Sequence, residues 1–172
     1  MRLFAVAAIA ACVAIPAAAQ PSLGPDLAGV GFLVGHWKSD DGKVSDTGGT
    51  SKGSSTISVE ANGEALLRRD HTDLFDKTGK PAGSFDQIML IYPEGGALHA
   101  DYSDGQHVIH YTRAIIVPGK SVTFTSTAQP SAPSFHLRYE VQSPDALALT
   151  FGMIPPGQTV VRPIAAGTLH KS

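Results

Sequence analysis

Dipeptides that form tight turns recur along the chain and limit what can lie between them. Asn62-Gly63, Gly95-Gly96, Asp104-Gly105 and Pro118-Gly119 each supply a positive or preset φ angle, and each separates runs that resemble strands. From residue 32 onward, no window of about ten residues shows the 3.6-residue apolar period of an amphipathic helix. The sequence therefore predicts a meander of antiparallel strands.

Ten strands are predicted between these turns, at 32–39, 50–60, 64–74, 85–92, 97–103, 107–117, 121–127, 135–142, 146–153 and 161–171. The longer connections at 76–84, 128–134 and 155–158 are rich in Pro and Gly and are expected at the strand ends. An open sheet of this kind would leave two unpaired edges, which closure removes. We therefore predict an all-β fold, an antiparallel up-and-down β-barrel of about ten strands with a short N-terminal helical plug. A flattened two-sheet sandwich with a solid core is the alternative.

Alternation of apolar and polar residues predicts the inward faces of several strands. Leu137 and Tyr139, for example, alternate with His136 and Arg138. By this parity the inward set comprises Leu98, Ala100, Tyr102, Val122, Phe124, Phe135, Leu137, Tyr139, Val141, Leu147, Leu149, Phe151 and Met153. The facing of three strands stays open, because 85–92 and 107–117 carry apolar residues on both faces and 64–74 carries charge on both.

Residues 1–19 have the composition of a secretory signal peptide. Arg2 precedes an apolar run over residues 3–15, and Ala17-Ala18-Ala19 supplies small residues for cleavage before Gln20. The run is shorter than the roughly 20 residues of a membrane-spanning helix, so no transmembrane segment is predicted. We expect export to the periplasm or the extracellular space. Lipid anchoring through Cys12 is less favoured, because the apolar run continues beyond it.

Charge and length limit the partners and the number of domains. Loss of Arg2 with the signal would change the formal net charge from −2 to −3, which gives no basic surface for nucleic acid. The remainder is expected to comprise a lead-in over 20–31 and one barrel domain over 32–172. In the lead-in, Ser22 is predicted to cap a helical turn that carries Leu23 and Leu27 on one face. The oligomeric state is left open.

A family resemblance follows from these features and from the stretch Phe32-Leu33-Val34-Gly35-His36-Trp37 after the lead-in. Together with the hairpin series and Phe135-His136-Leu137-Arg138-Tyr139-Glu140, this stretch resembles the lipocalin-like or calycin group. The most similar shape is the ten-stranded barrel of fatty-acid-binding proteins, nitrobindins and bacterial lipocalin-like domains. The resemblance implies that Gly35 and Trp37 form a barrel-closing motif, with a basic side chain over the indole. Lys171, Arg162 and Arg138 are the candidates for that side chain.

Two activities of this group find no counterpart in the expected positions. Nitrobindin-like proteins hold haem through a histidine ahead of the last strand, where this chain has Val161-Arg162-Pro163-Ile164. Fatty-acid-binding proteins grip a carboxylate with an interior Arg-x-Tyr, whereas Arg138 and Tyr139 are adjacent and point to opposite faces. We therefore expect neither a haem cofactor nor this carboxylate site in the closing strands.

Other polar clusters give weak support for catalysis. His99, Asp101, His107 and His110 are dense in sequence, but a regular strand turns them to different faces, so no metal site is predicted. Asp70-His71-Thr72-Asp73 is interpreted as a polar strand flank. No G-x-S-x-G motif is present, and Gly49-Thr50-Ser51-Lys52-Gly53 lacks phosphate-loop spacing. No catalytic residue is assigned, and binding is favoured over enzymatic activity.

The sequence thus predicts an exported lipocalin-like barrel that binds a small, largely apolar molecule without a covalent bond and without a cofactor. The two tyrosine hydroxyls of the expected lining would orient the ligand. The predicted ligand-binding residues are Trp37, Tyr102, Phe124, Leu137, Tyr139, Leu149, Phe151 and Met153. The alternatives are a haem- or metal-dependent enzyme in the same barrel and a structural envelope protein with a solid core.

Overall fold

The computed structural model of the protein describes residues 21–172, so the expected export signal lies outside the described residues. Its elements are, in chain order, the 3₁₀ helix η1 (Pro25–Leu33), β1 (Gly35–Val44), β2 (Gly49–Glu60), the 3₁₀ turn η2 (Ala61–Gly63), β3 (Ala65–Phe75), β4 (Pro81–Glu94), β5 (Ala97–Ser103), β6 (Val108–Val117), β7 (Ser121–Ser126), β8 (Ser134–Ser143), β9 (Ala146–Ile154) and β10 (Arg162–Lys171). No helix among these residues is long and apolar enough to cross a membrane.

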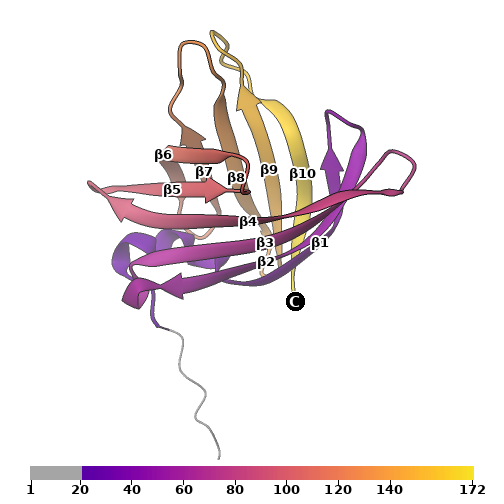
Figure 1. Ribbon diagram of the computed structural model, residues 1–172. Helices are drawn as coiled ribbons and strands as arrows, with labels where there is room; N and C mark the ends of the chain where they lie inside the picture. The colour runs from indigo at the N-terminus through magenta and orange to yellow at the C-terminus, as the bar shows by residue number, and fades with distance from the viewer. Residues whose placement is uncertain (1–20) are drawn as a thin grey trace, which may run out of the picture.

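The ten strands form one closed antiparallel barrel, which confirms the predicted fold class. Each strand pairs with its neighbours in the chain, and β10 pairs with β1 to close the sheet. In Figure 1, β2 to β5 run across the view while β8 to β10 rise steeply across them, so the wall bends sharply between these groups. Closure leaves no unpaired edge in the sheet that residues 35–171 form, as expected from the sequence.

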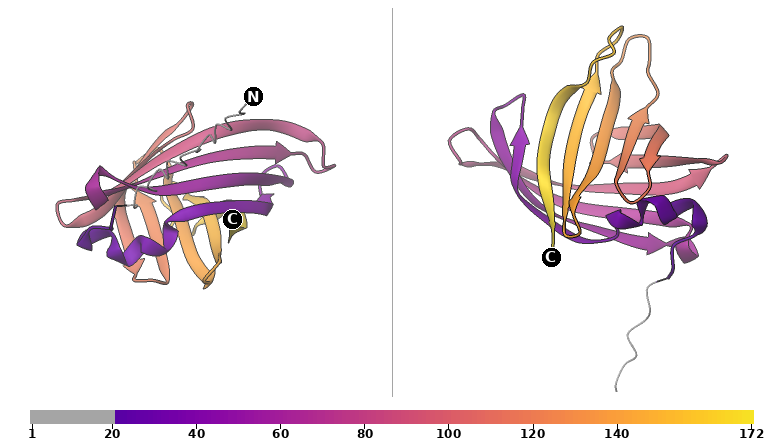
Figure 2. Two further views of the ribbon diagram at one scale, coloured as in Figure 1. Left: turned by 90° about the horizontal axis from the view of Figure 1, so that it is seen from below. Right: turned by 180° about the vertical axis from the view of Figure 1, so that it is seen from behind.

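The two ends of the barrel differ. In an up-and-down barrel the connections alternate between the ends, and those at 61–64, 95–96, 118–120 and 144–145 share one end. Helix η1 crosses this end (Figure 2), where the Gly24 amide donates to the Gly63 carbonyl and the Gly119 amide donates to the Gly29 carbonyl. We call it the closed end. The connections at 45–48, 76–80, 104–107, 127–133 and 155–161 surround the opposite, open end.

The bounds of two predicted strands and one predicted cap are wrong. Helix η1 continues through Leu33, so β1 begins at Gly35 rather than at residue 32, and it ends at Val44 rather than at residue 39. Burial explains this difference: η1 packs Leu27, Val30 and Leu33 against the barrel core, and Leu33 falls within the range predicted as strand. The N-cap position of η1 belongs to Gly24, with no side-chain hydrogen bond, so Ser22 does not cap it. Strand β4 begins at Pro81 rather than at residue 85.

The closed half of the barrel holds a continuous apolar core. Side chains from η1 and from the inner faces of the strands fill it: Leu27, Val30, Leu33, Trp37, Ile57, Leu66, Met89, Ile91, Leu98, Ala100, Ile109, Val122, Phe124, Tyr139 and Leu147 are all buried. The outer faces of β4 and β6 also carry exposed apolar side chains, namely Ile88, Leu90, Val108, Ile115 and Val117. This double-sided composition is the reason that alternation left the facing of these two strands open.

Candidate functional site

A cavity of about 330 Å³ lies inside the open half of the barrel, above the packed core. Its wall over β8 to β10 is apolar and includes Leu137, Leu149, Phe151, Ile164 and Leu169. Its wall over β2 to β6 and their connections carries the polar residues Ser55, Arg68, Asp70, Gln87, Tyr102, Asp104 and Tyr111, together with Leu74 and Phe85. Asp104, in the connection 104–107, also lines the cavity, which therefore reaches the open end. Lys52 and His71 border it as well, but the strand register turns their side chains to the outer face, opposite to Ser55 and Asp70.

The polar side of the cavity arises from an unusual inward face on β3. Arg68 and Asp70 share that face, and the fractional exposure of their side chains is only 9% and 8%. The strand register places Arg68 between Ile57 and Met89, and Asp70 between Ser55 and Gln87. Asp70 is therefore inside the barrel, and interpreting it as part of a polar strand flank is wrong. Alternation of apolar and polar residues does not identify the inward face of β3, because the barrel interior is itself polar there.

The Arg68 guanidinium is held by protein groups on three sides. Its Nε donates to Asp70 Oδ2 at 2.6 Å, and its Nη2 donates to the same oxygen and to Gln87 Oε1. On the far side, Nη1 donates to the Tyr139 hydroxyl at 2.6 Å. Burial alone would lower the pKa of Arg68, but the Asp70 carboxylate and Tyr139 more than compensate and raise it above its ordinary value. Arg68 is therefore a permanently charged group beneath the cavity.

Three tyrosines surround this ion pair. Tyr102 and Tyr111 line the cavity, whereas Tyr139 lies in the core below it. Burial raises the pKa of all three, and that of Tyr139 reaches about 12 although Arg68 opposes the shift. The Tyr102 hydroxyl donates to Asp104 Oδ2 at 3.4 Å. All three hydroxyls therefore stay protonated and neutral at physiological pH.

Several polar atoms of the cavity wall make no hydrogen bond within residues 21–172. Ser55 Oγ and Asp70 Oδ1 are buried without a partner there, and the two residues face each other directly across β2 and β3. None of the hydrogen bonds among the described residues uses the hydroxyl of Tyr111, whose fractional exposure is 2%. A buried polar atom without a partner costs about 1–3 kcal/mol, so this wall is suited to a polar group that completes it.

The eight residues predicted to bind ligand separate into three groups in the structure. Tyr102, Leu137, Leu149 and Phe151 line the cavity. Trp37, Phe124 and Tyr139 are fully buried in the core and lie outside the lining. Met153, which is half-buried on β9, also lies outside it. Alternation identified residues that face inward, but it does not show where along the barrel axis a residue lies. That position determines whether an inward residue lines the cavity or belongs to the packed core.

The closed end contains the predicted Gly35 and Trp37 pair. Trp37 has a fractional exposure of 1%, and its Nε1 donates to the Leu33 carbonyl at 2.8 Å. Of the three basic candidates, Lys171 lies over the indole, with Nζ 5.7 Å from the ring centroid. Gly35 has a φ of +142° and passes between the two side chains, in a conformation that favours glycine.

The histidines considered for metal binding lie apart on the outer surface and rim. His99 stacks on Tyr92, His110 lies 2.7 Å from Asp101, and His107 contacts Asp104 beside the open end. Within residues 21–172, no three His, Cys, Asp or Glu side chains gather as metal ligands would.

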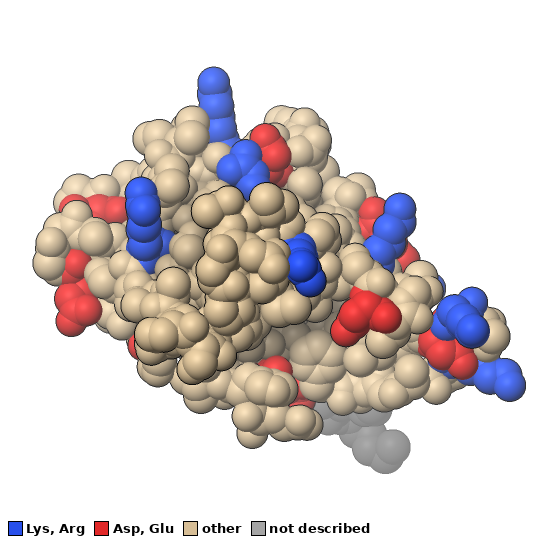
Figure 3. Space-filling view, turned by 90° about the horizontal axis from the view of Figure 1, so that it is seen from above, with Lys and Arg blue, Asp and Glu red and all other residues tan. Residues whose placement is uncertain are grey.

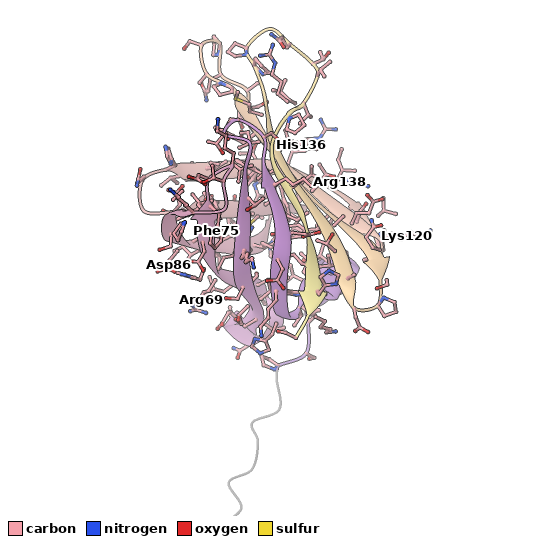
Figure 4. The ribbon with its side chains drawn as sticks, turned by 90° about the vertical axis from the view of Figure 1, so that its right-hand side faces the viewer. Arg69, Phe75, Asp86, Lys120, His136 and Arg138 are labelled. Carbon is pink, nitrogen blue, oxygen red and sulfur yellow. The ribbon has the colours of Figure 1, made fainter. Side chains whose placement is uncertain are left out.

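Charged side chains elsewhere are dispersed over the outer surface. Figure 4 shows Arg69 and Asp86 outside the wall formed by β3 and β4, in contrast to their neighbours Arg68, which is buried, and Gln87, which is half-buried. Viewed from the open end, positive and negative groups are interspersed over the visible face (Figure 3). The surface therefore offers no extended patch of one sign on this face, and the concentrated polar chemistry lies inside the barrel.

The fold and the cavity together define a closed ten-stranded antiparallel β-barrel with an internal chamber open at one end. Comparison of the sequence with models of known protein families gives no match, and no curated protein shows significant similarity to it.

Proposed function

We propose that this protein is an exported, calycin-like carrier that binds a small, largely apolar molecule non-covalently inside its barrel. The observation that carries the proposal is the unequal filling of the interior: the closed half is packed, whereas the open half encloses about 330 Å³. Such a volume lies near the lower end of the roughly 300–1,000 Å³ range of small-molecule sites. Small-molecule sites are also typically lined by apolar side chains with a few convergent polar groups, as this cavity is.

Export is supported by the sequence of residues 1–19. Arg2, the apolar run and Ala17-Ala18-Ala19 together predict cleavage before Gln20. Mass analysis of the protein from an exporting host should give a chain that begins at Gln20. Retention of Met1, or a lipid on Cys12, would contradict this part of the proposal.

A surface role in the envelope is the second candidate, because one observation favours it. Ile88, Leu90, Val108, Ile115 and Val117 are exposed on the outer faces of β4 and β6, where contact with a partner would bury them. That role requires no cavity. The carrier function and the surface role therefore predict different results when the cavity is filled, because only the carrier function should then lose ligand binding.

Two tryptophan substitutions on β9 provide the test. Leu149 lines the cavity, whereas Leu147 is fully buried in the core of the closed half, two residues away on the same face. Leu149→Trp should therefore fill space, and Leu147→Trp should overpack the core at a cost of about 1–3 kcal/mol. Binding is measured with N-phenyl-1-naphthylamine, a neutral apolar dye whose fluorescence rises in an apolar site, and stability is measured by urea unfolding.

The proposal expects saturable dye binding by the wild type, at least tenfold weaker binding by Leu149→Trp, and nearly unchanged stability of that variant. Leu147→Trp should instead lose stability while the folded fraction retains the dye. If the wild type shows no saturable binding, or if Leu149→Trp binds the dye as well as the wild type does, the internal site is refuted. The envelope role would then remain.

A further inference from the structure

Resting on the proposed function, we propose that the cavity selects a neutral apolar molecule that carries a hydroxyl group over a fatty-acid anion of the same chain length. The inference concerns the polar group of the ligand, which the apolar wall does not determine. It follows from the charge balance beneath the cavity and from the hydrogen bonds that the wall leaves unmade.

The charge balance disfavours a carboxylate ligand. Arg68 is the only buried cation among the described residues of the lining, and its guanidinium already donates to Asp70, Gln87 and Tyr139. A second carboxylate, that of Asp104, also lines the cavity. Besides Lys52, whose exposed side chain lies on the outer face, the lining contains two carboxylates and one cation that is already paired. An anionic ligand would therefore enter a partly desolvated chamber and find no unpaired buried cation there. Desolvating a charge without a new partner is strongly unfavourable.

The unmade hydrogen bonds favour a group that both donates and accepts. Asp70 Oδ1 accepts no hydrogen bond from residues 21–172, and an ionised carboxylate oxygen offers only lone pairs. The neighbouring Ser55 Oγ and the Tyr111 hydroxyl can each donate or accept. An alcohol matches this set, because its oxygen accepts while its proton is donated. A ketone or an ester offers no proton, and an alkylammonium offers no lone pair to the Ser55 and Tyr111 hydroxyls.

Ligand competition tests the selection directly. Wild-type protein loaded with N-phenyl-1-naphthylamine is titrated at pH 7.5 with 1-decanol, decanoate or decylamine, which have the same chain length and differ in the polar group. We expect 1-decanol to displace the dye at a concentration at least tenfold below that required for either charged compound. Decanoate or decylamine that competes as well as 1-decanol overturns the inference, while the proposed function stands.

The Asp70→Asn variant gives a second readout with an opposite sign. The substitution keeps the shape and removes the charge that balances Arg68, so the guanidinium becomes available to a ligand carboxylate. In this variant the affinity for decanoate should rise at least tenfold relative to the affinity for 1-decanol. An unchanged ratio between the two compounds overturns the inference.

A milder pair of variants keeps the test decisive if Asp70→Asn does not fold. Ser55→Ala removes a buried hydroxyl that has no partner within residues 21–172, whereas the control Ser84→Ala changes an exposed serine of β4 that does not line the cavity. Ser55→Ala should weaken the binding of 1-decanol several-fold and leave that of decanoate unchanged, and Ser84→Ala should change neither. Equal effects of Ser55→Ala on both compounds refute the inference. Failure of every compound and of the dye to bind refutes the proposed function itself.

Discussion

Arg68 on β3 and Tyr139 on β8 are 71 residues apart in the chain and meet across the barrel interior, where Arg68 Nη1 donates to the Tyr139 hydroxyl at 2.6 Å. The guanidinium also lies 5.9 Å from the centroid of the same ring. This contact joins opposite walls at the level where the packed core ends and the cavity begins. The polar pair therefore forms the floor of the proposed site.

Removing one member of the buried Arg68–Asp70 pair should lower the free energy of unfolding strongly, whereas replacing both members with apolar residues should lower it little. Asp70→Val leaves a buried guanidinium without its carboxylate, and Arg68→Met leaves the reverse, so each single variant should lose about 3–5 kcal/mol. The double variant removes both charges and should recover most of that loss. Urea unfolding of the three variants gives the comparison.

Strand β8 offers a matched control for this prediction. Arg138 and Glu140 have the same spacing as Arg68 and Asp70 but lie on the outer face, 3.2 Å apart, with side chains that are 37% and 48% exposed. Glu140→Val should therefore cost no more than about 1 kcal/mol. Equal losses for Asp70→Val and Glu140→Val would contradict the difference in burial on which the argument depends.

Stability should fall steeply at alkaline pH. Burial raises the pKa of Tyr139 to about 12 from its ordinary value of 10, while unfolded chains ionise at the ordinary value. The contribution of Tyr139 is therefore fully present below pH 10 and is lost as the pH rises toward 12, by about 2 kcal/mol. Urea unfolding between pH 8 and 12 measures the loss. Tyrosinate absorbance should appear at a higher pH in the folded protein than in the unfolded chain.

Tyr139→Phe separates this effect from other alkaline changes. The variant removes the ionisable hydroxyl, and with it the acceptor for Arg68 Nη1, so it should be less stable at neutral pH by about 1–3 kcal/mol. Its stability should nevertheless decline less steeply above pH 10 than that of the wild type. Parallel curves for the two proteins would show that Tyr139 does not contribute.

The closed end should depend strongly on its indole and weakly on the cation above it. Trp37→Ala removes a fully buried side chain and should cost about 3–5 kcal/mol, whereas Lys171→Met removes a partly solvated cation–π contact worth about 0.5–1 kcal/mol. Because Trp37 is the only tryptophan, its emission reports this end alone and should be blue-shifted in both the wild type and Lys171→Met. Red-shifted emission from the folded wild type would contradict the burial.

Sequence patterns were sufficient for the strands whose two faces differ. On β8, Leu137 and Tyr139 point inward and Arg138 and Glu140 lie toward solvent, as alternation predicted. The turn at Gly95-Gly96 has both residues at positive φ, as its composition required. Local chemistry therefore determined where the strands end and how most of them face.

The polar floor of the cavity was beyond such reasoning. On β3 the inward positions carry Arg68 and Asp70 while the outward ones carry Arg69 and His71, so both faces look polar in sequence. The signal that was present is the spacing of two residues between Arg68 and Asp70, which places opposite charges on one face of a strand. Tyr139, the partner of Arg68 on β8, comes near it only because the barrel closes. The spacing of residues within one strand contains no information about that contact.

The separation of a packed end from an open one gives the barrel two regions with different tolerance to change. Substitutions near η1 disturb the core that stabilises the whole sheet, whereas the connections at 45–48, 76–80, 104–107, 127–133 and 155–161 surround the mouth. Loop insertions cost little when they leave the packed core intact. The mouth is accordingly the place where evolution or a protein engineer can graft new recognition loops, because the entropic cost of a longer loop grows only slowly with its length.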